Sequence, residues 1–413
     1  MIYRLTYNGQ TYNERMVLSG SKSESNRVLI IRFLSQSNFQ IENLSNSDDT
    51  KVLEEALKNI DSKNEFDVEH AGTAMRFLTA LFCITKGERI LKGSPRMHER
   101  PIKLLVDALK ALGAEISYLE KEGFPPLKIK GKNLSGSEIS IRGNISSQYL
   151  SALAMIAPYL KNGLTLIITS EFTSKPYLLM TLNMMRHFGI NVEESGNKII
   201  IKNGNYSAKN YSVESDWSSA SYWFEAMSFC SGSSLELIGL KNENSLQPDS
   251  IVKELYTLFG VNAKPIKNGI KLTSQPLKTD DNWAIDFTNF PDIAQTLACT
   301  FVGFQKRALL NGLHTLRIKE TDRIEAMKHE LEKLGAIITT TDNSLEIIDF
   351  KPTDKNHCIN TYNDHRMAMS FASLVFILKE INIKNPQVVS KSYPQFWDNL
   401  KQLGVKIERI IEC

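Results

Sequence analysis

The 413-residue sequence has little of what marks membrane proteins, disulfide-stabilised proteins or nucleic-acid binders. Five cysteines occur without a CxxC pair, and we expect them to be buried or incidental thiols in a reducing cytoplasm. No apolar run is long enough to span a bilayer, and the first residues carry no signal-peptide pattern. With 49 basic and 46 acidic residues, the net charge of +3 argues against a dedicated nucleic-acid binder. We therefore expect a cytoplasmic protein that binds neither nucleic acid nor membranes.

Two further absences concern cofactors. The GxxxxGK loop of many nucleotide-binding proteins is missing, and the seven histidines are scattered rather than clustered with cysteines. We expect neither a metal nor a cofactor. The composition, 42% apolar and 23% charged, is typical of a globular protein and excludes disorder, and the length predicts two or three domains.

A short repeated phrase organises the chain: a helical pattern, then Leu or Phe followed by glycine, then alternating apolar residues. Each copy predicts a helix that ends at the glycine and turns into a strand. The glycines, 76, 71, 75 and 69 residues apart, are Gly113, Gly189, Gly260, Gly335 and Gly404. A second strand is expected after four of them, at 126–130, 198–202, 269–273 and 344–348.

A second phrase is a polar or glycine start followed by an apolar helix rich in small residues. Its copies begin near Ser23, Gly72, Ser146, Trp217, Pro291 and Asp364, with spacings of 74, 71, 74 and 73 from the second copy onward. Near-equal spacing in one context argues against coincidence. Six α/β repeats of about 70 residues, the first one shortened, exceed a single core, so we expect two domains of three repeats each.

The fourth small-residue helix places the domain boundary. Because it begins near residue 217, a boundary near 215 divides the repeats equally. We expect residues 20–215 to form one domain and residues 216–413 together with 1–19 to form the other. A strand at Ile2 to Val17 would then pair with the C-terminal domain, and the chain would cross between domains twice, near 19–20 and near 215.

Polar residues collect at the expected helix starts, where free N–H groups and the helix dipole attract anions. The first start holds Gly20, serines, and Lys22 and Arg27 about one turn apart. Each such start fits an ordinary capped helix when taken alone, but together they supply many cations, several hydroxyls and a few carboxylates. That set suits a crowded anionic substrate. The other starts are at 71–76, 95–101, 146–148, 174–177, 291–292, 317–323, 364–366 and Lys391.

The segments 20–23, 71–76, 317–323, 363–369 and 391–394, taken in this order, resemble the 5-enolpyruvylshikimate-3-phosphate synthase family over the whole chain. The resemblance implies an inside-out α/β barrel of two domains, three repeats in each, that close on shikimate 3-phosphate and phosphoenolpyruvate. It implies enolpyruvyl transfer to the 5-hydroxyl of shikimate 3-phosphate, with release of phosphate, in chorismate and aromatic amino acid biosynthesis. Glyphosate, a phosphonate zwitterion, would compete with phosphoenolpyruvate.

The resemblance also implies contacts for individual residues. It assigns shikimate 3-phosphate mainly to the 20–215 domain, and phosphoenolpyruvate and the catalytic carboxylates to the other. The residues implied for shikimate 3-phosphate are Lys22, Ser23, Arg27, Ser146, Ser147, Gln148, Ser174, Tyr177, Asp292, Thr315 and Lys319. Those implied for phosphoenolpyruvate are Lys22, Gly72, Arg100, Gln148, Arg323, Arg366 and Lys391. The sequence departs from the usual family pattern at Ser19, His70, Phe77 and Thr315, where Pro, Asn, Pro and Asn are common.

The chemistry of enolpyruvyl transfer fits the carboxylates and cations of this set. The methylene carbon of phosphoenolpyruvate must gain a proton before the hydroxyl attacks C2, and phosphate must then leave. Glu320 is our candidate acid at the methylene, Asp292 the candidate base for the 5-hydroxyl, and Lys22 a second proton-transfer group at the bridging and phosphate oxygens. Arginines stay charged and bind carboxylate and phosphate in bidentate fashion.

Two alternatives are disfavoured. An enolpyruvyl transferase acting on UDP-N-acetylglucosamine would have Lys-Asn at Lys22-Ser23 and a loop cysteine, but no cysteine lies between Cys83 and Cys230. A non-catalytic anion-binding repeat protein would not need to keep Lys22, Asp292 and Glu320 together. The partners we expect are the two small-molecule substrates, and the protein is expected to be a monomer.

Overall fold

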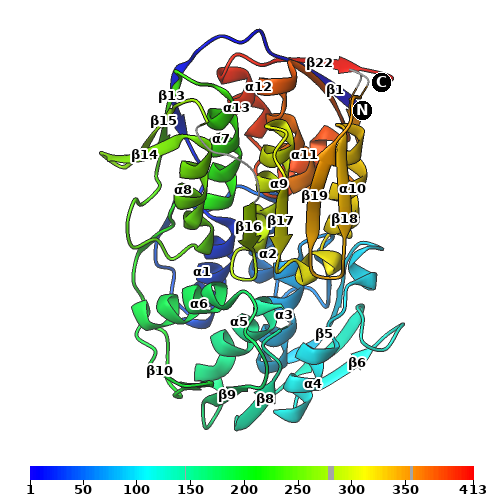
Figure 1. Cartoon of the computed structure of the whole chain (residues 1–413). Coiled ribbons are helices and arrows are strands. Elements are labelled where there is room, and N and C mark those ends of the chain that lie inside the picture. The colour runs from blue at the N-terminus through cyan, green and yellow to red at the C-terminus, as the bar shows by residue number, and fades with distance from the viewer. Residues whose placement is uncertain (145, 278–282, 354–356) are drawn as a thin grey trace. The chain divides into compact units, whose positions relative to one another are not determined.

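A computed structural model describes residues 1–144, 146–277, 283–353 and 357–413. The chain divides into two compact units, one of Met1–Gly20 with Glu214–Cys413 and one of Ser21–Val213. We call them unit 1 and unit 2. In each unit, buried helices are covered by small sheets that lie on the outside (Figure 1). Within the described ranges, no helix is long and apolar enough to cross a membrane.

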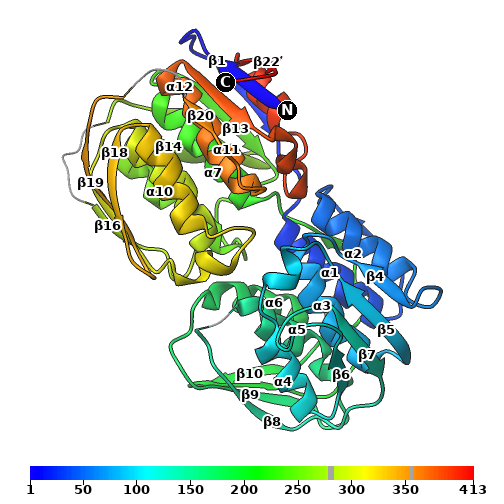
Figure 2. The ribbon, with the colours of Figure 1, turned by 90° about the vertical axis from the view of Figure 1, so that its right-hand side faces the viewer.

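Unit 2 is built around three buried helices that are rich in small and apolar residues (Figure 2). They are α1 (Lys22–Leu34), α3 (Gly72–Ile84) and α5 (Ser147–Ile156). The outer helices are α2 (Asp48–Lys58), α4 (Lys103–Ala111) and α6 (Lys175–His187), with the 3₁₀ turn η1 (Met97–Glu99). One sheet has the order β4 (Glu65–Asp67), β5 (Gly87–Lys92), β7 (Leu127–Gly131), β6 (Glu115–Tyr118). The second has the order β10 (Val192–Ser195), β11 (Lys198–Ile201), β9 (Leu164–Ile168), β8 (Glu138–Ile141), and β3 (Ile41–Glu42) pairs with β12 (Tyr211–Ser212).

Unit 1 repeats this plan around α7 (Trp217–Phe229), α9 (Ala294–Gly303) and α11 (His365–Ser373). Hydroxyls join these three helices, since Thr296 contacts both Ser221 and Ser370 at 3.2 and 3.3 Å. The remaining helical elements are η3 (Pro248–Ile251), α8 (Val252–Leu255), η4 (Tyr256–Phe259), η5 (Pro291–Ile293), η6 (His314–Ile318), α10 (Arg323–Lys333), α12 (Val375–Leu378), η7 (Pro386–Lys391) and α13 (Phe396–Gln402).

Three four-stranded sheets cover unit 1. Their orders are β14 (Val261–Ile266), β15 (Gly269–Ser274), β13 (Ser234–Ile238), β2 (Asn13–Val17); β16 (Trp283–Asp286), β17 (Ala308–Asn311), β19 (Leu345–Phe350), β18 (Ala336–Thr340); and β20 (Cys358–Ile359), β21 (Glu380–Lys384), β1 (Ile2–Thr6), β22 (Lys406–Ile410). A complete repeat therefore runs strand, buried helix, strand, outer helix and two further strands, as predicted. The structure adds that the strands on either side of the buried helix are parallel and that the last two strands are antiparallel to each other. The first repeat is the shortened one, with only β3 and β12.

The N-terminal segment belongs to unit 1, and the predicted pairing is confirmed with two strands in place of one. β1 pairs antiparallel with β21 and β22, so that Ile2 faces Lys384 and Ile410. β2 pairs parallel with β13, with Asn13 opposite Ser234. Each N-terminal strand thus completes a sheet whose other strands come from far along the chain.

The five Leu-Gly and Phe-Gly glycines all have positive φ, between +76° and +95°. This left-handed conformation ends each outer helix and is accessible to glycine without strain. A strand begins within three residues of every one of them. The predicted helix-to-strand turns and the four following strands are confirmed.

The cysteine expectation was only partly correct. Cys83, Cys230 and Cys299 are free and buried, as predicted. Cys358 on β20 and the last residue, Cys413, form a disulfide with a Cα–Cα distance of 6.0 Å. Their 55-residue separation matches no spacing motif. They come together because β20 and β22, the strands nearest to them, belong to the same sheet.

Candidate active site

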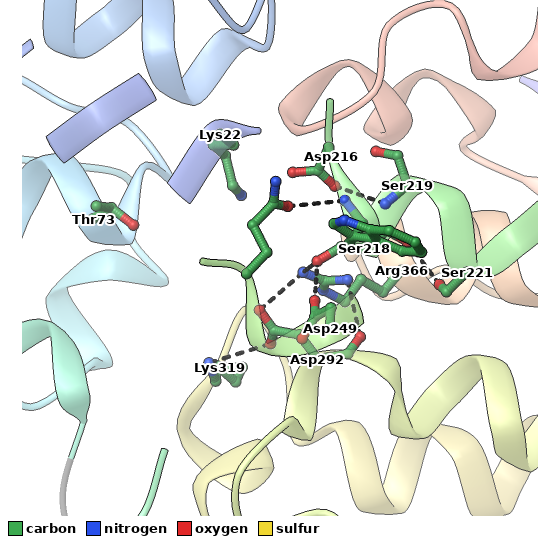
Figure 3. A network of polar contacts seen from close by, with 12 residues as sticks. Lys22, Thr73, Asp216, Ser218, Ser219, Ser221, Asp249, Asp292, Lys319 and Arg366 are labelled. Carbon is green, nitrogen blue, oxygen red and sulfur yellow. Dashed lines mark hydrogen bonds and ion pairs between the residues drawn. The ribbon is translucent and has the colours of Figure 1, made fainter. Parts of the chain in front are cut away.

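Three helix starts of unit 1 carry one connected polar network. Asp292 lies in the 3₁₀ turn η5 that opens α9, Arg323 is the first residue of α10, and Arg366 is in the first turn of α11. Helix α9 packs against both α10 and α11, so the repeat brings these side chains together (Figure 3 shows Asp292 and Arg366). Sequence reasoning had placed all three in the site.

The Asp292 carboxylate is the centre of the network. Its Oδ1 lies 3.5 Å from Lys319 Nζ and its Oδ2 lies 2.9 Å from Arg366 Nη2 (Figure 3). Its Oδ1 also lies 3.4 Å from Arg323 Nη1. Arg366 Nη1 also donates to the Asp292 carbonyl at 2.9 Å. Burial raises the pKa of this carboxyl, but Arg366, Lys319 and Arg323 outweigh burial and hold the pKa well below its usual range. Asp292 is therefore ionised at any physiological pH.

Arg323 is held by two other carboxylates. Its Nε donates to Asp364 at 2.6 Å, and its Nη2 donates to Glu320 at 2.9 Å. The side chains of Arg323 and Asp364 are 1% and 0% exposed. Burial lowers the pKa of Arg323, but Asp364, Glu320 and Asp292 more than offset this and raise it, so the guanidinium stays charged. Asp364 also caps α11 through the Arg366 N–H.

The sequence reasoning missed two residues that hold Arg366 in place, Ser218 and Asp249. Arg366 Nη2 donates to the Ser218 hydroxyl at 3.3 Å, and that hydroxyl hydrogen-bonds the buried carboxylate of Asp249 (Figure 3). Ser218 lies in the first turn of α7, which Asp216 caps. Asp249 comes from η3, and nothing in the sequence around it signalled a role beyond a turn.

Two predicted residues of unit 1 need separate comment. Thr315 on η6 is 7% exposed, and its hydroxyl has no hydrogen-bond partner among the described residues. Lys391 was grouped with helix starts, which is wrong: it is the last residue of η7. Its Nζ donates to the Asn363 carbonyl at 2.7 Å, beside the loop that opens α11, so the side chain still reaches this region.

In unit 2, Arg27 is buried among neutral acceptors. Its guanidinium donates to Thr181 Oγ1 at 2.6 Å, Ser151 Oγ at 3.2 Å, and the carbonyls of Ser23 and Tyr177 at 2.8 and 3.3 Å. Burial lowers the pKa of Arg27 to about 10, which still leaves it charged at neutral pH. These bonds join α1 to α5 and α6.

Phe77, where the family commonly has proline, covers the Arg27 guanidinium with its ring centroid 5.5 Å from Cζ. The α3 helix runs through Phe77 without a break. The side chain is buried, so it contributes to the wall that holds Arg27.

Gly72 and Arg100 lie in direct contact. A Cβ added to Gly72 would stand 2.7 Å from Arg100 Nη1 and 2.8 Å from Nη2. Arg76 fixes this arrangement, since it donates to the Gly72 and Pro101 carbonyls at 3.3 and 3.2 Å. Arg96, the other arginine of the 95–101 segment, instead pairs with Glu99 at 2.8 Å on the surface.

Lys22 is the first residue of α1, and its Nζ lies 2.9 Å from Asp49 Oδ2. Asp49 was missed by the sequence reasoning. Its position in the first turn of α2 is common for acidic residues, so the only signal was a second polar helix start at 45–50.

The remaining predicted residues of unit 2 cluster at the starts of α5 and α6. Ser146 caps α5 by accepting from the Gln148 N–H, and Gln148 Nε2 donates to Thr73 on α3 at 3.1 Å. Ser147 is the first residue of α5. Ser174 precedes α6 in the left-handed conformation and makes no side-chain cap, and Tyr177 offers its carbonyl to Arg27. Ile145 lies outside the described residues.

Each unit therefore presents cations and hydroxyls at the starts of repeat-related helices, and unit 1 adds ionised carboxylates. Such an arrangement in a repeat-built α/β chain suits the binding of small, highly anionic molecules.

Comparisons with known proteins identify the family. The profile of the family described as EPSP synthase (3-phosphoshikimate 1-carboxyvinyltransferase) matches residues 61–400, and the chain belongs to this family. A 3-phosphoshikimate 1-carboxyvinyltransferase of Bacteroides fragilis (strain YCH46) is 44% identical over 397 residues, which cover 95% of each chain. The protein of that name from Photobacterium damsela subsp. piscicida is 38% identical, over 95% of this chain and 97% of its own.

Solved structures agree on the fold. EPSP synthase from Acinetobacter baumannii superimposes with a TM-score of 0.77 at 20% identity, covering 99% of this chain and all of that one. The fold expectation from the sequence, an inside-out α/β barrel built from six repeats, is confirmed.

Proposed function

We propose that this protein transfers the enolpyruvyl group of phosphoenolpyruvate to the 5-hydroxyl of shikimate 3-phosphate and releases phosphate. The observation that carries the proposal is the Asp292 carboxylate, held ionised within 3.5 Å of Lys319, Arg323 and Arg366. A base beside several cations is what the attack of a hydroxyl on a crowded anion requires. Family membership supports the same reaction.

The addition step uses two carboxyl groups. Glu320 is paired with Arg323 in the free protein, and in this proposal it takes up a proton once substrate anions draw Arg323 away. It then gives that proton to the methylene carbon of phosphoenolpyruvate, and C2 becomes electron-poor. The 5-hydroxyl oxygen forms a bond to C2 while its proton passes to Asp292, and a tetrahedral intermediate results. The arginines stabilise the carboxylate and phosphate of the intermediate.

The elimination step reverses the proton movement at carbon. The Glu320 carboxylate takes a proton from the new methyl group, the double bond forms again, and the C2–O bond to phosphate breaks. Lys22 donates a proton to the departing bridging oxygen. The proton held by Asp292 then replaces the one that Lys22 gave, so both residues return to their starting states. Overall, the hydroxyl proton leaves on phosphate, and Glu320 returns to its starting state.

The three cations around Asp292 make it a weaker base in the absence of substrate. With its pKa held low, Asp292 is ionised but accepts a proton weakly. Anionic groups of the substrates would compete for Arg323, Arg366 and Lys319 and so weaken their hold on Asp292. In this proposal, the arrival of substrate is what makes Asp292 a competent base.

The remaining residues bind. We assign shikimate 3-phosphate to Lys22, Ser23, Arg27, Ser146, Ser147, Gln148, Ser174, Tyr177, Asp292, Thr315 and Lys319, and phosphoenolpyruvate to Lys22, Gly72, Arg100, Gln148, Arg323, Arg366 and Lys391. The buried hydroxyl of Thr315, which has no hydrogen-bond partner among the described residues, supports its place in this set. We further propose that the enzyme acts as a monomer in the cytoplasm and that glyphosate competes with phosphoenolpyruvate.

The proposal is tested by phosphate release from phosphoenolpyruvate with each candidate acceptor. Turnover with shikimate 3-phosphate and none with UDP-N-acetylglucosamine is the expected result. Turnover only with the nucleotide sugar would favour the related transferase. Binding of both anions without phosphate release would instead indicate a non-catalytic anion-binding protein.

A further inference from the structure

In unit 2, Asp49 is shared between two potential cations. Its Oδ2 lies 2.9 Å from Lys22 Nζ, and its Oδ1 lies 3.5 Å from His70 Nε2. The side chain of Asp49 is only 5% exposed, that of Lys22 16%, and that of His70 23%. The three residues come from different elements: Lys22 from α1, Asp49 from α2, and His70 from the segment between β4 and α3.

The start of α2 holds Asp49 in place. Ser47 caps the helix by accepting from the Thr50 N–H, and the Ser47 hydroxyl also bonds the Thr50 hydroxyl at 3.0 Å. Ser45 adds a further hydroxyl bond to Ser47 at 3.0 Å. These bonds fix the backbone at the start of α2, from which the Asp49 carboxylate lies within reach of both Lys22 and His70.

Two carboxylates of unit 2, Asp49 and Glu69, lie close to the His70 imidazole. Asp49 on α2 faces its Nε2, with Lys22 of α1 on the far side of that carboxylate. Glu69, the preceding residue, lies 3.8 Å from Nδ1, but its side chain is 64% exposed and therefore screened. Of these two carboxylates, the buried Asp49 is the less screened and therefore interacts more strongly with the imidazole.

Histidine is the side chain whose ordinary pKa lies closest to neutral pH. When the imidazole is neutral, Asp49 is engaged by Lys22 alone. When the imidazole is protonated, its charge offsets that of Asp49, and the Lys22 ammonium is more available to an anion. The geometry points to His70 as a positioning residue that, through Asp49, sets how strongly Lys22 binds the substrate anion.

This inference rests on the proposed role of Lys22 in substrate binding. It predicts that protonation of His70 strengthens the productive binding of phosphoenolpyruvate. Asparagine is the variant of choice at position 70, because it keeps a polar side chain of similar reach and cannot be protonated. The substrates also titrate near neutral pH, so each pH point must be compared between the two proteins.

The experiment measures kcat/KM for phosphoenolpyruvate from pH 5.5 to 8.5 in wild type and in His70→Asn. The ratio of wild type to variant should be about threefold to tenfold higher at pH 5.5 than at pH 8.5, the effect of about half to one pKa unit of charge interaction. A merely structural role would give a ratio that does not change with pH, and that result would overturn the inference. Glu69→Gln, the matched control, should follow the wild-type profile.

A second measurement follows the imidazole directly by NMR. The His70 titration in Asp49→Asn should move to lower pH than in wild type, since the anion that favours the imidazolium is gone. An unchanged midpoint would contradict the coupling.

Lys22→Met separates the inference from the proposed function. If Lys22→Met keeps nearly full kcat/KM, the proposed role of Lys22 is wrong, and the inference falls with it. If Lys22→Met loses activity while the His70→Asn ratio stays flat, only the coupling to His70 is refuted.

Discussion

The two units use one repeat and place arginines near helix starts, but these arginines are bound by different groups. The difference concerns the arginines only, since Lys22 of unit 2 pairs with the Asp49 carboxylate. In unit 1, Arg323 and Arg366 bind the carboxylates of Asp292, Glu320 and Asp364. In unit 2, Arg27 is bound by hydroxyls and carbonyls. The difference separates two tasks. Carboxylates beside cations can move protons and can be released by an incoming anion, whereas a cation held by neutral dipoles remains available to attract one.

The largest effect is expected from Asp292→Asn in unit 1. Asparagine keeps the shape of the side chain but cannot accept a proton, so kcat should fall by about 10²–10⁴-fold with a much smaller change in KM. Steady-state kinetics with both substrates provides the measurement, and Glu320→Gln should behave similarly.

The matched control for Asp292 is Asp322→Asn. Asp322 is a carboxylate of the same unit, but it caps α10 and pairs with Arg317. Its variant should keep kcat within about threefold of wild type. The weaker helix cap should lower the free energy of unfolding instead. Equal losses in both variants would show that removing any nearby carboxylate suffices, and would remove the special role of Asp292.

Arg27→Lys tests whether unit 2 needs more than charge. A lysine cannot reproduce the four hydrogen bonds that Arg27 donates from its planar guanidinium. We expect KM for shikimate 3-phosphate to rise roughly 30-fold to 100-fold, about 2–3 kcal/mol. Arg32→Lys, on the same helix but partly exposed near Glu54, is the control and should change little. An unaltered KM in Arg27→Lys would mean that charge alone defines this half of the site.

Gly72→Ala is expected to act through Arg100. The added methyl would meet the guanidinium at 2.7 Å, and the flexible arginine would have to move. KM for phosphoenolpyruvate and the inhibition constant of glyphosate should both rise about tenfold, since overpacking of one methyl costs about 1–3 kcal/mol. The control is Gly204→Ala, whose methyl would meet only Ile190 at 3.9 Å. It should change neither KM nor the inhibition constant. A rise for glyphosate alone would instead place the methyl against the inhibitor.

The last prediction concerns stability rather than activity, at a carboxyl of unit 1 that lacks the cations of Asp292. Glu225 on α7 is fully buried, and burial raises its pKa well above the ordinary value. The folded protein therefore keeps a proton that the unfolded chain releases above about pH 4.5, and the free energy of unfolding falls as the pH rises.

Glu225→Gln cannot ionise and should remove this loss. The difference in unfolding free energy, variant minus wild type, should rise by about 2 kcal/mol between pH 5 and 7, measured by urea denaturation. Glu254→Gln, on the exposed face of α8, should give no such trend. A flat difference for Glu225→Gln would mean that the carboxyl is solvated in the folded state.

Much of the fold was predictable because it is local and repeated. Gly113 and its four counterparts require a left-handed turn, and small residues after a polar start require a buried helix. The helix starts also pointed to Asp292, Arg323, Arg366 and Arg27 as candidates, since free N–H groups at a helix start attract anions. Asp49, Asp249 and the disulfide between Cys358 and Cys413 could not be found in this way. Each of them depends on a partner far along the chain or on an element without a distinctive pattern.

The sequence by itself determined the period, the order of helices and strands, and the type of chemistry, because these depend on residue types at fixed local spacing. Only the tertiary structure decided which carboxylate neutralises which cation. Arg96 and Arg100 are four residues apart, yet one pairs with Glu99 at the surface and the other lies against Gly72. The physical reason is that an ion pair is a contact of a few ångströms between side chains, and helix packing, not spacing along the chain, sets those distances.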